Sequence, residues 1–298
     1  MNDSRILAII LNWQQPETTI ECVQSLRSMN GPRLDILVID NGSKDDSPSL
    51  LKDSLIDASF LELPENLGFA GGANVGLRKA LDEGYDLCLL INNDAFPARD
   101  MLTRLIAQLA EDIALLSPKI LYESQPDKIW FAGASQDPNS LELRGRAQGT
   151  SDGPQWMESR DVDYLLGTCL LVNLDAVKEV GLMDDRFFMY YEDLDWSIRF
   201  RKAGYRLRLV ADAHLYHRVS VSSGGTNSPL RRYHLARNGT IFYHKHSQDG
   251  RPLFIILLRF GSAIKTLAEL IFYGHLDCAR AYLRGLQDGL RVARSSKG

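Results

Sequence analysis

Residues Ile6–Asn12 read Ile-Leu-Ala-Ile-Ile-Leu-Asn, an unbroken apolar run that stops at an amide side chain. A short run of this kind is typical of a β-strand that is buried on both faces. The pattern returns at Ile36–Ile39 and Leu87–Ile91, and helical periodicity lies between these runs at Pro16–Met29 and Asn74–Glu83. Repeated strand–helix units predict an α/β protein whose central sheet is mostly parallel and has helices on both faces.

The other expected elements are weaker, and they lie at Ser49–Leu55, Phe60–Leu63, Asp100–Ala110, Tyr164–Val172 and Asp175–Val180. Gln125–Asp163 is rich in Gly, Pro, Asp and Ser, which predicts irregular loops and short strands on a lid or acceptor side. We expect one domain over residues 1–228, with a donor-binding half over about 1–120 and an acceptor and catalytic half over about 121–228. A helical C-terminal extension is expected over residues 229–298.

Charge is divided unevenly along the 298 residues. Residues 229–298 carry 12 Lys and Arg against 4 Asp and Glu, which leaves 22 against 34 for residues 1–228. An acidic body argues against a uniform nucleic-acid-binding surface. Four cysteines, far apart and among apolar neighbours, predict buried thiols instead of a disulfide or zinc framework. Without a signal-peptide pattern or a run of 18 apolar residues, we expect a cytoplasmic protein that has no transmembrane helix.

Polar clusters follow three of the expected strands, at Asn12-Trp13, Asp40-Asn41-Gly42-Ser43 and Asn92-Asn93-Asp94. Parallel α/β sheets bind ligands at the carboxyl ends of their strands. Three polar clusters at equivalent positions therefore predict a ligand site at this edge of the sheet. Oxygen ligands in the last cluster are suited to Mg²⁺ or Mn²⁺ beside a diphosphate.

The stretch Glu65–Asn74 places several glycines just before an expected helix. Glycine lets backbone N–H groups approach a phosphate or sugar closely, and a helix N-terminus favours an anion. The stretch matches neither the dinucleotide-binding pattern GxGxxG nor the phosphate-binding loop GxxxxGK[ST]. The alternative interpretation is a tight loop in which glycine packs the start of the helix.

The densest group of acidic residues is Glu192, Asp193 and Asp195, behind the aromatic run Phe187–Tyr191. A helix is expected to begin here and to end at Gly204, so these residues occupy its first turns. Acidic residues in a first turn commonly complement the helix dipole. The functional alternative is a carboxylate general base held against an apolar wall.

Taken together, the motifs resemble the inverting glycosyltransferases of family 2, which have the GT-A fold, and most of all the bacterial rhamnosyltransferase-like members of surface-polysaccharide assembly. Five stretches carry the resemblance, at 10–13, 38–43, 66–74, 90–94 and 191–195, within roughly residues 5–245. The resemblance implies transfer of a sugar, rhamnose from dTDP-rhamnose as the first choice, to a saccharide or lipid-linked saccharide. A UDP-hexose or UDP-galactofuranose donor is the alternative, and an inactive nucleotide-sugar-binding module is the alternative from another class.

The resemblance also implies roles for matching residues. The donor would be bound by Asn12, Asp40, Asn41, Ser43, Asn66, Gly68, Phe69, Gly72, Asn74, Asn92, Asn93 and Asp94, with Asp40 accepting from the base N–H. Asp94 matches the last carboxylate of the family's DxD motif, and His217 matches a histidine that some relatives contribute. These two would ligate Mg²⁺ or Mn²⁺, although Asn92 stands in place of the first aspartate. Asp193 would be the general base, assisted by Glu192.

The basic C-terminal part leaves two interpretations open. Tyr233–Asn238 resembles a Tyr-Arg-Asn stretch found after the catalytic domain of such enzymes. Candidates for contact with a phosphate or the acceptor are Trp196, Arg232 and Arg237. Beyond Arg251, basic residues alternate with apolar ones. The helices expected there lie either on the cytosolic face of the inner membrane, bound to anionic lipid, or against the protein body or a second copy in a homodimer.

Overall fold

The computed structural model describes residues 4–219 and 228–295. The chain divides into two compact units. The first comprises residues up to 135 together with 145–188 and 192–219, and the second comprises 136–144, 189–191 and the C-terminal region from 220. Two short internal segments, 136–144 and 189–191, thus group with the C-terminal helices. The division of the chain is therefore not a single boundary after residue 228.

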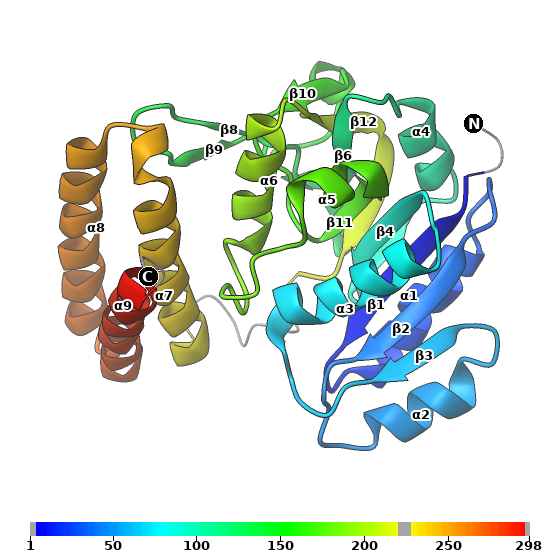
Figure 1. The fold of residues 1–298 in the computed structure, drawn as a ribbon, viewed down its shortest axis with the longest axis horizontal. Coiled ribbons are helices and arrows are strands. Elements are labelled where there is room, and N and C mark those ends of the chain that lie inside the picture. The colour runs from blue at the N-terminus through cyan, green and yellow to red at the C-terminus, as the bar shows by residue number, and fades with distance from the viewer. Residues whose placement is uncertain (1–3, 220–227, 296–298) are drawn as a thin grey trace. The chain divides into compact units, whose positions relative to one another are not determined.

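The first unit is built on a ten-stranded sheet with the path β10-β12-β6-β11-β4-β1-β2-β3 (Figure 1). Strands β1, β2, β3 and β4 run parallel, at Ile6–Asn12, Asp35–Asp40, Ser59–Glu62 and Leu87–Asn92. β11 (Cys169–Asn173) is antiparallel to both β4 and β6 (Ile113–Tyr122), and β12 (Arg206–His217) is parallel to β6. The remaining strands of this sheet are β5 (Ala95–Pro97), β7 (Gln125–Phe131) and β10 (Arg160–Val162).

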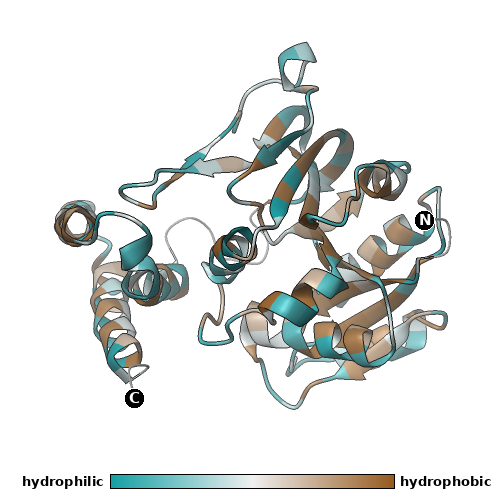
Figure 2. Ribbon diagram, turned by 45° about the horizontal axis from the view of Figure 1, so that its top comes forward, coloured by the Kyte–Doolittle hydropathy of each residue, from teal (hydrophilic) through white to brown (hydrophobic). Residues whose placement is uncertain are grey.

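Helices cover both faces of this sheet, as the sequence predicts. They are α1 (Pro16–Arg27), α2 (Ser47–Ser54), α3 (Gly68–Asp82), α4 (Met101–Ala107), α5 (Leu174–Val180) and α6 (Glu192–Lys202). Alternate residues of β1 enter two separate hydrophobic clusters: Leu7 and Ile9 pack with α3 and α6, whereas Ile6 and Ile10 pack with α1, α2 and α4. Figure 2 shows the resulting hydrophobic colour along the central strands. Burial on both faces explains why β1 is apolar at consecutive positions.

The segment predicted as irregular loops and short strands, Gln125–Asp163, contains the short strands β7 and β10 and a 3-10 turn at Pro154–Trp156, and β8 (Ala134–Gln136) pairs with β9 (Leu143–Gly145). All four cysteines are free and buried, which confirms the prediction of buried thiols.

Helix α3 begins at Gly68, so the expectation that the glycines precede the helix is wrong. Gly68 has a φ of 73° and passes so close to Phe188 that no Cβ would fit. A Cβ on Gly76 would lie 2.7 Å from the Ile9 side chain. Glycine is a poor helix former. Here close packing of α3 on β1 outweighs that preference.

The second unit contains the expected helical extension, with α7 (Pro229–His246), α8 (Pro252–Phe272) and α9 (Leu276–Ser295). α7 and α9 approach closely because Gly285 and Gly289 face α7; a Cβ on Gly289 would lie 2.5 Å from the carbonyl oxygen of Arg237. Among the residues that the structure describes, no helix is long and apolar enough to cross a membrane.

A strained turn in the second unit precedes Glu192 in the chain. Tyr190 and Tyr191 have φ values of 70° and 74°, which non-glycine residues rarely adopt. Asn238 of α7 holds the turn, because its Nδ2 donates to the carbonyl oxygens of Met189 at 2.7 Å and Tyr190 at 3.1 Å. Such strain persists only where surrounding contacts enforce it.

Candidate active site

A chain of buried hydrogen bonds joins the carboxyl ends of β1, β2 and β4. Asn12 lies beside Asp40 in the parallel register and donates from Nδ2 to its Oδ2 at 2.7 Å. Thr19 of α1 donates from Oγ1 to Asn12 Oδ1 at 2.7 Å, and Asn93 Nδ2 donates to Thr19 Oγ1 at 3.1 Å. The structure thus brings the three predicted polar clusters together. Thr19 was missed, because nothing in the helical pattern of α1 marks it.

In the turn after β2, the Ser43 side chain is partly exposed, whereas the Asp40 side chain is buried. Asp40 and Asn12 are both fully buried. Asp40 accepts from the Ser43 backbone N–H at 2.8 Å and from Ser43 Oγ at 2.7 Å, in addition to Asn12. Trp13 follows Asn12 with 44% of its surface exposed, and Gln14 N–H donates to Ser43 Oγ at 2.9 Å. Trp13 thus presents an exposed aromatic ring directly after the buried strand β1.

Asn41 and Asn66 hold the N-terminus of α3 beside the end of β2. Asn41 Oδ1 accepts from Leu67 N–H at 3.0 Å, and its Nδ2 donates to the Gly68 carbonyl oxygen at 3.0 Å. Asn66 Oδ1 accepts from Gly68 N–H at 2.8 Å. A Cβ on Gly72 would lie 3.2 Å from Asn41 Nδ2. These predicted residues therefore lie close together, and these hydrogen bonds join them to one another and to the start of α3.

Asn74, one of the residues predicted for the donor site, is buried and forms its hydrogen bonds within the protein. It is 1% exposed; its Nδ2 donates to the Met183 carbonyl oxygen at 2.8 Å, and its Oδ1 accepts from Met183 N–H at 3.0 Å. Because α3 begins at Gly68, Asn74 lies well inside the helix on its buried face. Phe69 is half-buried instead, and a Cβ on Gly167 would lie 3.3 Å from its ring.

Asp94 and His217 form a buried pair. The antiparallel pairing of β5 with β12 brings them together, with His217 opposite Ala95. Asp94 Oδ1 lies 3.1 Å from His217 Nε2, and the two residues are 2% and 7% exposed. The His217 ring lies against Trp130, with the centroids 4.4 Å apart. His217 Nδ1 is buried and has no hydrogen-bond partner among the described residues.

This pair fits a divalent cation. Asp94 Oδ1 and His217 Nε2 lie within hydrogen-bond distance of each other, at 3.1 Å, so two atoms of types that ligate divalent cations are already side by side. A carboxylate oxygen and an imidazole nitrogen suit Mn²⁺, and the carboxylate suits Mg²⁺. Within the described part of the chain, no group of three His, Cys, Asp or Glu side chains is placed to hold a metal. A cation here would therefore take its other ligands from elsewhere.

Asp193 lies in the first turn of α6 and accepts several hydrogen bonds. Its Oδ2 accepts from Tyr164 Oη at 2.8 Å and from Gly167 N–H at 2.9 Å, and its Oδ1 accepts from Leu194 N–H at 2.8 Å. Glu192 is also buried, and its Oε2 has no hydrogen-bond partner among the residues that the structure describes. Tyr164 was not predicted as a site residue, because it is far from Asp193 in the sequence.

Backbone contacts connect Asp193 with the end of β4. Gly167 donates to Asp193, and the next residue, Thr168, accepts from Asn92 N–H through its carbonyl oxygen at 2.9 Å. This bond continues the antiparallel pairing of β11 with β4. Asn92 is followed by Asn93 and Asp94. The carboxylate of α6 and the Asp94–His217 pair are thus linked through a few residues of main chain.

Burial governs the pKa values of the two adjacent carboxyl groups. It raises the pKa of Asp193, while hydrogen bonds from Gly167 and Tyr164 act in the opposite direction. Burial raises the pKa of Glu192 well above its ordinary value, and the Asp193 charge raises it further. The two neighbouring carboxyl groups titrate as a coupled pair, and the hydrogen bonds from Tyr164 and Gly167 favour the ionised form of Asp193.

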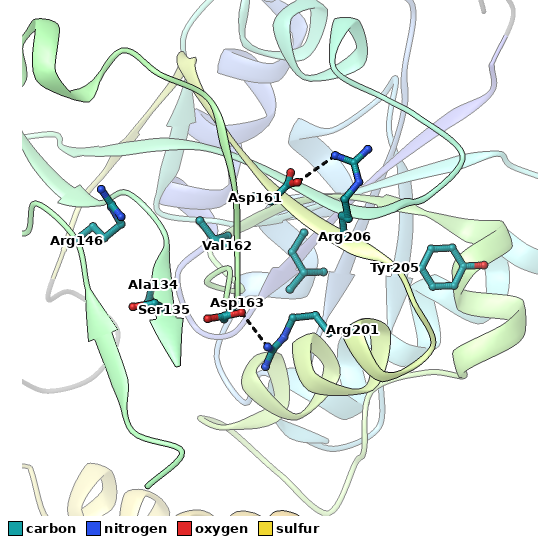
Figure 3. Close-up of a pocket in the computed structure, with 10 residues that line it drawn as sticks. Ala134, Ser135, Arg146, Asp161, Val162, Asp163, Arg201, Tyr205 and Arg206 are labelled. Carbon is teal, nitrogen blue, oxygen red and sulfur yellow. Dashed lines mark hydrogen bonds and ion pairs between the residues drawn. The ribbon is translucent and has the colours of Figure 1, made fainter. Parts of the chain in front are cut away.

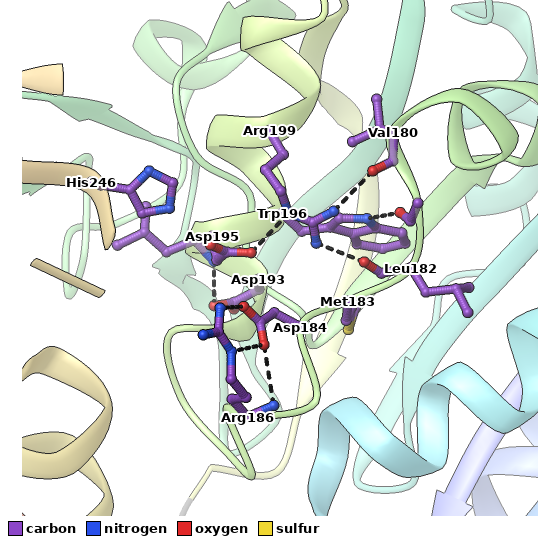
Figure 4. Close-up of polar contacts among 12 residues, drawn as sticks. Val180, Leu182, Met183, Asp184, Arg186, Asp193, Asp195, Trp196, Arg199 and His246 are labelled. Atoms are coloured by element: carbon purple, nitrogen blue, oxygen red, sulfur yellow. Dashed lines mark hydrogen bonds and ion pairs between the residues drawn. The ribbon is translucent and has the colours of Figure 1, made fainter. Parts of the chain in front are cut away.

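Trp196, predicted as a possible contact of a phosphate or the acceptor, belongs to the hydrophobic core. It is fully buried, and its indole N–H donates to the Gly181 carbonyl oxygen at 2.9 Å (Figure 4). Asp195 is likewise fully buried, in an ion pair with Arg199 at 2.8 Å. Both side chains thus face the interior of the first unit.

The two basic candidates, Arg232 and Arg237, both lie on α7 in the second unit and are half-buried. Arg237 Nη1 donates to Asn238 Oδ1 at 2.7 Å. Arg237 thus supports the side chain that holds the strained turn.

A pocket of about 290 Å³ in the first unit contains none of the predicted site residues (Figure 3). Two ion pairs join four of its charged groups: Arg201 with Asp163 at 2.9 Å, and Arg206 with Asp161 at 3.1 Å. The predicted polar and acidic site residues lie at the carboxyl ends of the strands, and not in this pocket.

The family model for glycosyl transferase family 2 matches residues 8–165, and that for glycosyl transferase family group 2 matches residues 87–273. The chain is 23% identical to dTDP-rhamnosyl transferase RfbF of Shigella flexneri, over 82% of this chain and 81% of that protein. It is 28% identical to an N-acetylglucosaminyl-diphospho-decaprenol L-rhamnosyltransferase of Mycobacterium tuberculosis, over 63% and 68% respectively. Galactofuranosyltransferase GlfT1 of the same species is 24% identical, over 71% and 69%.

Solved glycosyltransferases share the fold. GalNAc-T7, solved with UDP, GalNAc and Mn²⁺, has a TM-score of 0.63 at 16% identity, over 83% of this chain and 51% of that one, so the chain spans about half its length. Mannosyltransferase PcManGT of Pyrobaculum calidifontis, solved with GDP-Man and Mn²⁺, has a TM-score of 0.59 at 17% identity, over 99% and 76%. The family match, the parallel sheet and these neighbours lead to one conclusion: the chain is a glycosyltransferase of GT-A fold and belongs to glycosyl transferase family 2.

Proposed function

We propose that this enzyme transfers a sugar with inversion and that Asp193 is its general base. The observation that carries the proposal is the buried Asp193 carboxylate, whose Oδ2 accepts from Tyr164 and Gly167. Asp193 takes the proton of an acceptor hydroxyl while that oxygen attacks the anomeric carbon. The bond from this carbon to the diphosphate oxygen breaks on the opposite face, and its electron pair leaves with the nucleoside diphosphate. One displacement inverts the anomeric centre without a covalent enzyme intermediate.

Glu192 supports this division of roles. Burial and the neighbouring Asp193 charge both oppose the ionisation of Glu192 and raise its pKa. Asp193, in contrast, accepts hydrogen bonds from Tyr164 and Gly167 that stabilise its ionised form, which favours Asp193 as the group that takes the acceptor proton. Glu192 is thus a positioning residue beside the base.

Asp94 and His217 are the residues that would hold Mg²⁺ or Mn²⁺ in this proposal. The pairing of β5 with β12, which brings the Asp94 carboxylate beside the His217 imidazole, supports it. A divalent cation would stabilise the negative charge that grows on a leaving diphosphate. Asn92 supplies an amide where a carboxylate ligand would otherwise stand, so the donor's own phosphate oxygens would complete the coordination.

For the donor, we favour dTDP-rhamnose, with a UDP-hexose or UDP-galactofuranose as the alternative. The printed names of two relatives, a dTDP-rhamnosyl transferase and an L-rhamnosyltransferase, support rhamnose, and the galactofuranosyltransferase supports the alternative. The exposed Trp13 offers a ring on which a nucleobase can stack, next to Ser43 and Asp40.

For the acceptor, we favour a saccharide or lipid-linked saccharide of a cell-surface polysaccharide, acted on at the cytoplasmic side. The name of the diphospho-decaprenol relative supports a lipid-linked acceptor. An inactive nucleotide-sugar-binding module would not need the buried Asp193, whose ionised form is costly without a function. The hydrogen bonds of Asp193 therefore favour catalysis.

Donor binding and turnover test the proposal separately. Thermal unfolding with dTDP-rhamnose, UDP-galactofuranose and UDP-hexoses, each with Mn²⁺ or Mg²⁺, should raise Tm for one donor, because binding to the folded state stabilises it. Asp193→Asn should keep that rise and lower turnover by about 10²–10⁴-fold, the usual contribution of a general base. Retained turnover would remove Asp193 from the role, and no rise with any sugar nucleotide would remove the donor assignment.

A further inference from the structure

Helix α8 exposes an apolar stripe along its length. Leu253, Leu257, Phe260, Ile264 and Ile271 recur at intervals of three, four or seven residues, so they share one side of the helix. Their exposed fractions are 71%, 62%, 67%, 53% and 58%. Only Ile255 and Leu270 of this helix are buried. Continuous exposed apolar surface of this kind marks an interaction site.

The stripe is wide and carries no charge. At about 100° per residue, the exposed Ile256 lies at one edge and the exposed Phe254 and Phe272 at the other, an arc of about 160°. The charged residues of α8, Arg259, Lys265 and Glu269, all fall outside this arc. A seam with a single partner helix needs a narrower stripe. The width therefore favours a broad apolar surface such as a lipid interface.

Helix α9 presents basic and apolar side chains together. Leu276, Leu283 and Leu290 recur every seven residues and are 52%, 45% and 47% exposed. The same face carries exposed arginines, namely Arg280, Arg284, Arg291 and Arg294. The opposite face packs on α7 through Gly285 and Gly289, so the arginine face points outward. Leucines interleaved with arginines are typical of helices that lie in the headgroup region of a membrane.

The net positive charge of the segment that contains α8 and α9 favours binding to anionic lipid. Between Arg251 and Ser295 there are seven basic side chains and three acidic ones. Two of the acidic ones, Asp277 and Asp288, are paired with arginines of α9 at 3.1 and 3.0 Å. Anionic phospholipid attracts such an excess of positive charge, whereas a second copy of the same basic surface repels it.

We propose that α8 and α9 form a membrane-binding surface that lies on an anionic lipid leaflet without crossing it. The apolar arc of α8 enters the interface, and the arginines of α9 contact lipid phosphates. This surface is independent of the sugar chemistry, so its test needs no substrate.

Vesicle sedimentation of the full chain tests the proposal. The protein should sediment with vesicles of phosphatidylcholine and phosphatidylglycerol, less with phosphatidylcholine alone, and less at high salt, because screening weakens the charge attraction. Phe260→Ser/Ile264→Ser should lower partition by on the order of tenfold, because less apolar surface is buried. Arg284→Gln/Arg294→Gln should lower partition by a similar factor, on the order of tenfold, for anionic vesicles only.

Ile56→Ser is the matched control, because Ile56 is an 88% exposed apolar residue of the first unit; it should partition like the unchanged protein. All replaced side chains are exposed, so circular dichroism and Tm should stay the same. No sedimentation with anionic vesicles, or equal partition of every variant, would overturn the proposal. A dimer in light scattering that is lost in Phe260→Ser/Ile264→Ser, without vesicle binding, would instead assign the surface to a second copy.

Discussion

Tyr164→Phe isolates one hydrogen bond of the proposed base. Tyr164 Oη donates to Asp193 Oδ2 at 2.8 Å inside the protein, where both residues are 7% exposed. The hydroxyl stabilises the ionised carboxylate and so acts to lower the pKa of Asp193 against the effect of burial. Removing it leaves the Gly167 N–H in place and keeps the ring, whose edge contacts Phe131.

The expected shift in the pKa of Asp193 is large because the Tyr164 hydroxyl donates to a charged carboxylate. A hydrogen bond to a charged group contributes about 1.5–3 kcal/mol, and about 1.4 kcal/mol corresponds to one pH unit. Without the hydroxyl, Asp193 binds its proton more tightly, so the acid limb of kcat/KM should move to higher pH by about 1–2 pH units. At high pH, where Asp193 is ionised in either protein, the rates should converge.

The assay is glycosyl transfer measured across pH, with Tyr205→Phe as the control. Tyr205→Phe also removes a hydroxyl that donates to a carboxylate, that of Glu179 at 2.7 Å, and the Tyr205 ring packs against Phe200. The control should keep the acid limb in place. If Tyr164→Phe folds and its acid limb coincides with that of the unchanged protein, Asp193 is not the group that titrates in the rate, and the reasoning fails.

Two further predictions concern the other buried groups. Asp94→Asn should weaken Mn²⁺-dependent donor binding in calorimetry by at least tenfold, because one of the two proposed protein ligands loses its charge. The control Asp45→Asn changes an exposed carboxylate and should leave donor affinity unchanged. If the unchanged protein binds the donor equally well with and without a chelator, the cation site is contradicted. Glu192→Gln should flatten the pH dependence of the free energy of unfolding, measured with urea. The raised folded-state pKa of Glu192 means that its stabilisation is present below its ordinary value of 4.5 and is lost as pH rises through the folded value. An unchanged profile would show that burial of Glu192 does not penalise its charge.

The predicted elements that proved right share a cause. β1, β2 and β4 were predicted within a residue at each end, because burial on both faces leaves an apolar run between polar turns. The helices on both faces follow from the same alternation of strand and helix, whereas the GT-A fold is what the motifs that resemble family 2 imply. The start of α3 was predicted six residues too late, because glycine content indicates a loop until the packing on β1 is known.

By itself, the sequence determined the strand–helix order, the family and the three polar clusters at the strand ends, since each of these is written in contiguous residues. Only the tertiary structure decided which side chains face the site. It buried Asn74 and Trp196 and gave Asp193 its partners in Tyr164 and Gly167. Those contacts join residues more than twenty positions apart, through strand pairing and the rotation of each helix. Neither the strand pairing nor the rotation of a helix can be predicted from a local sequence pattern.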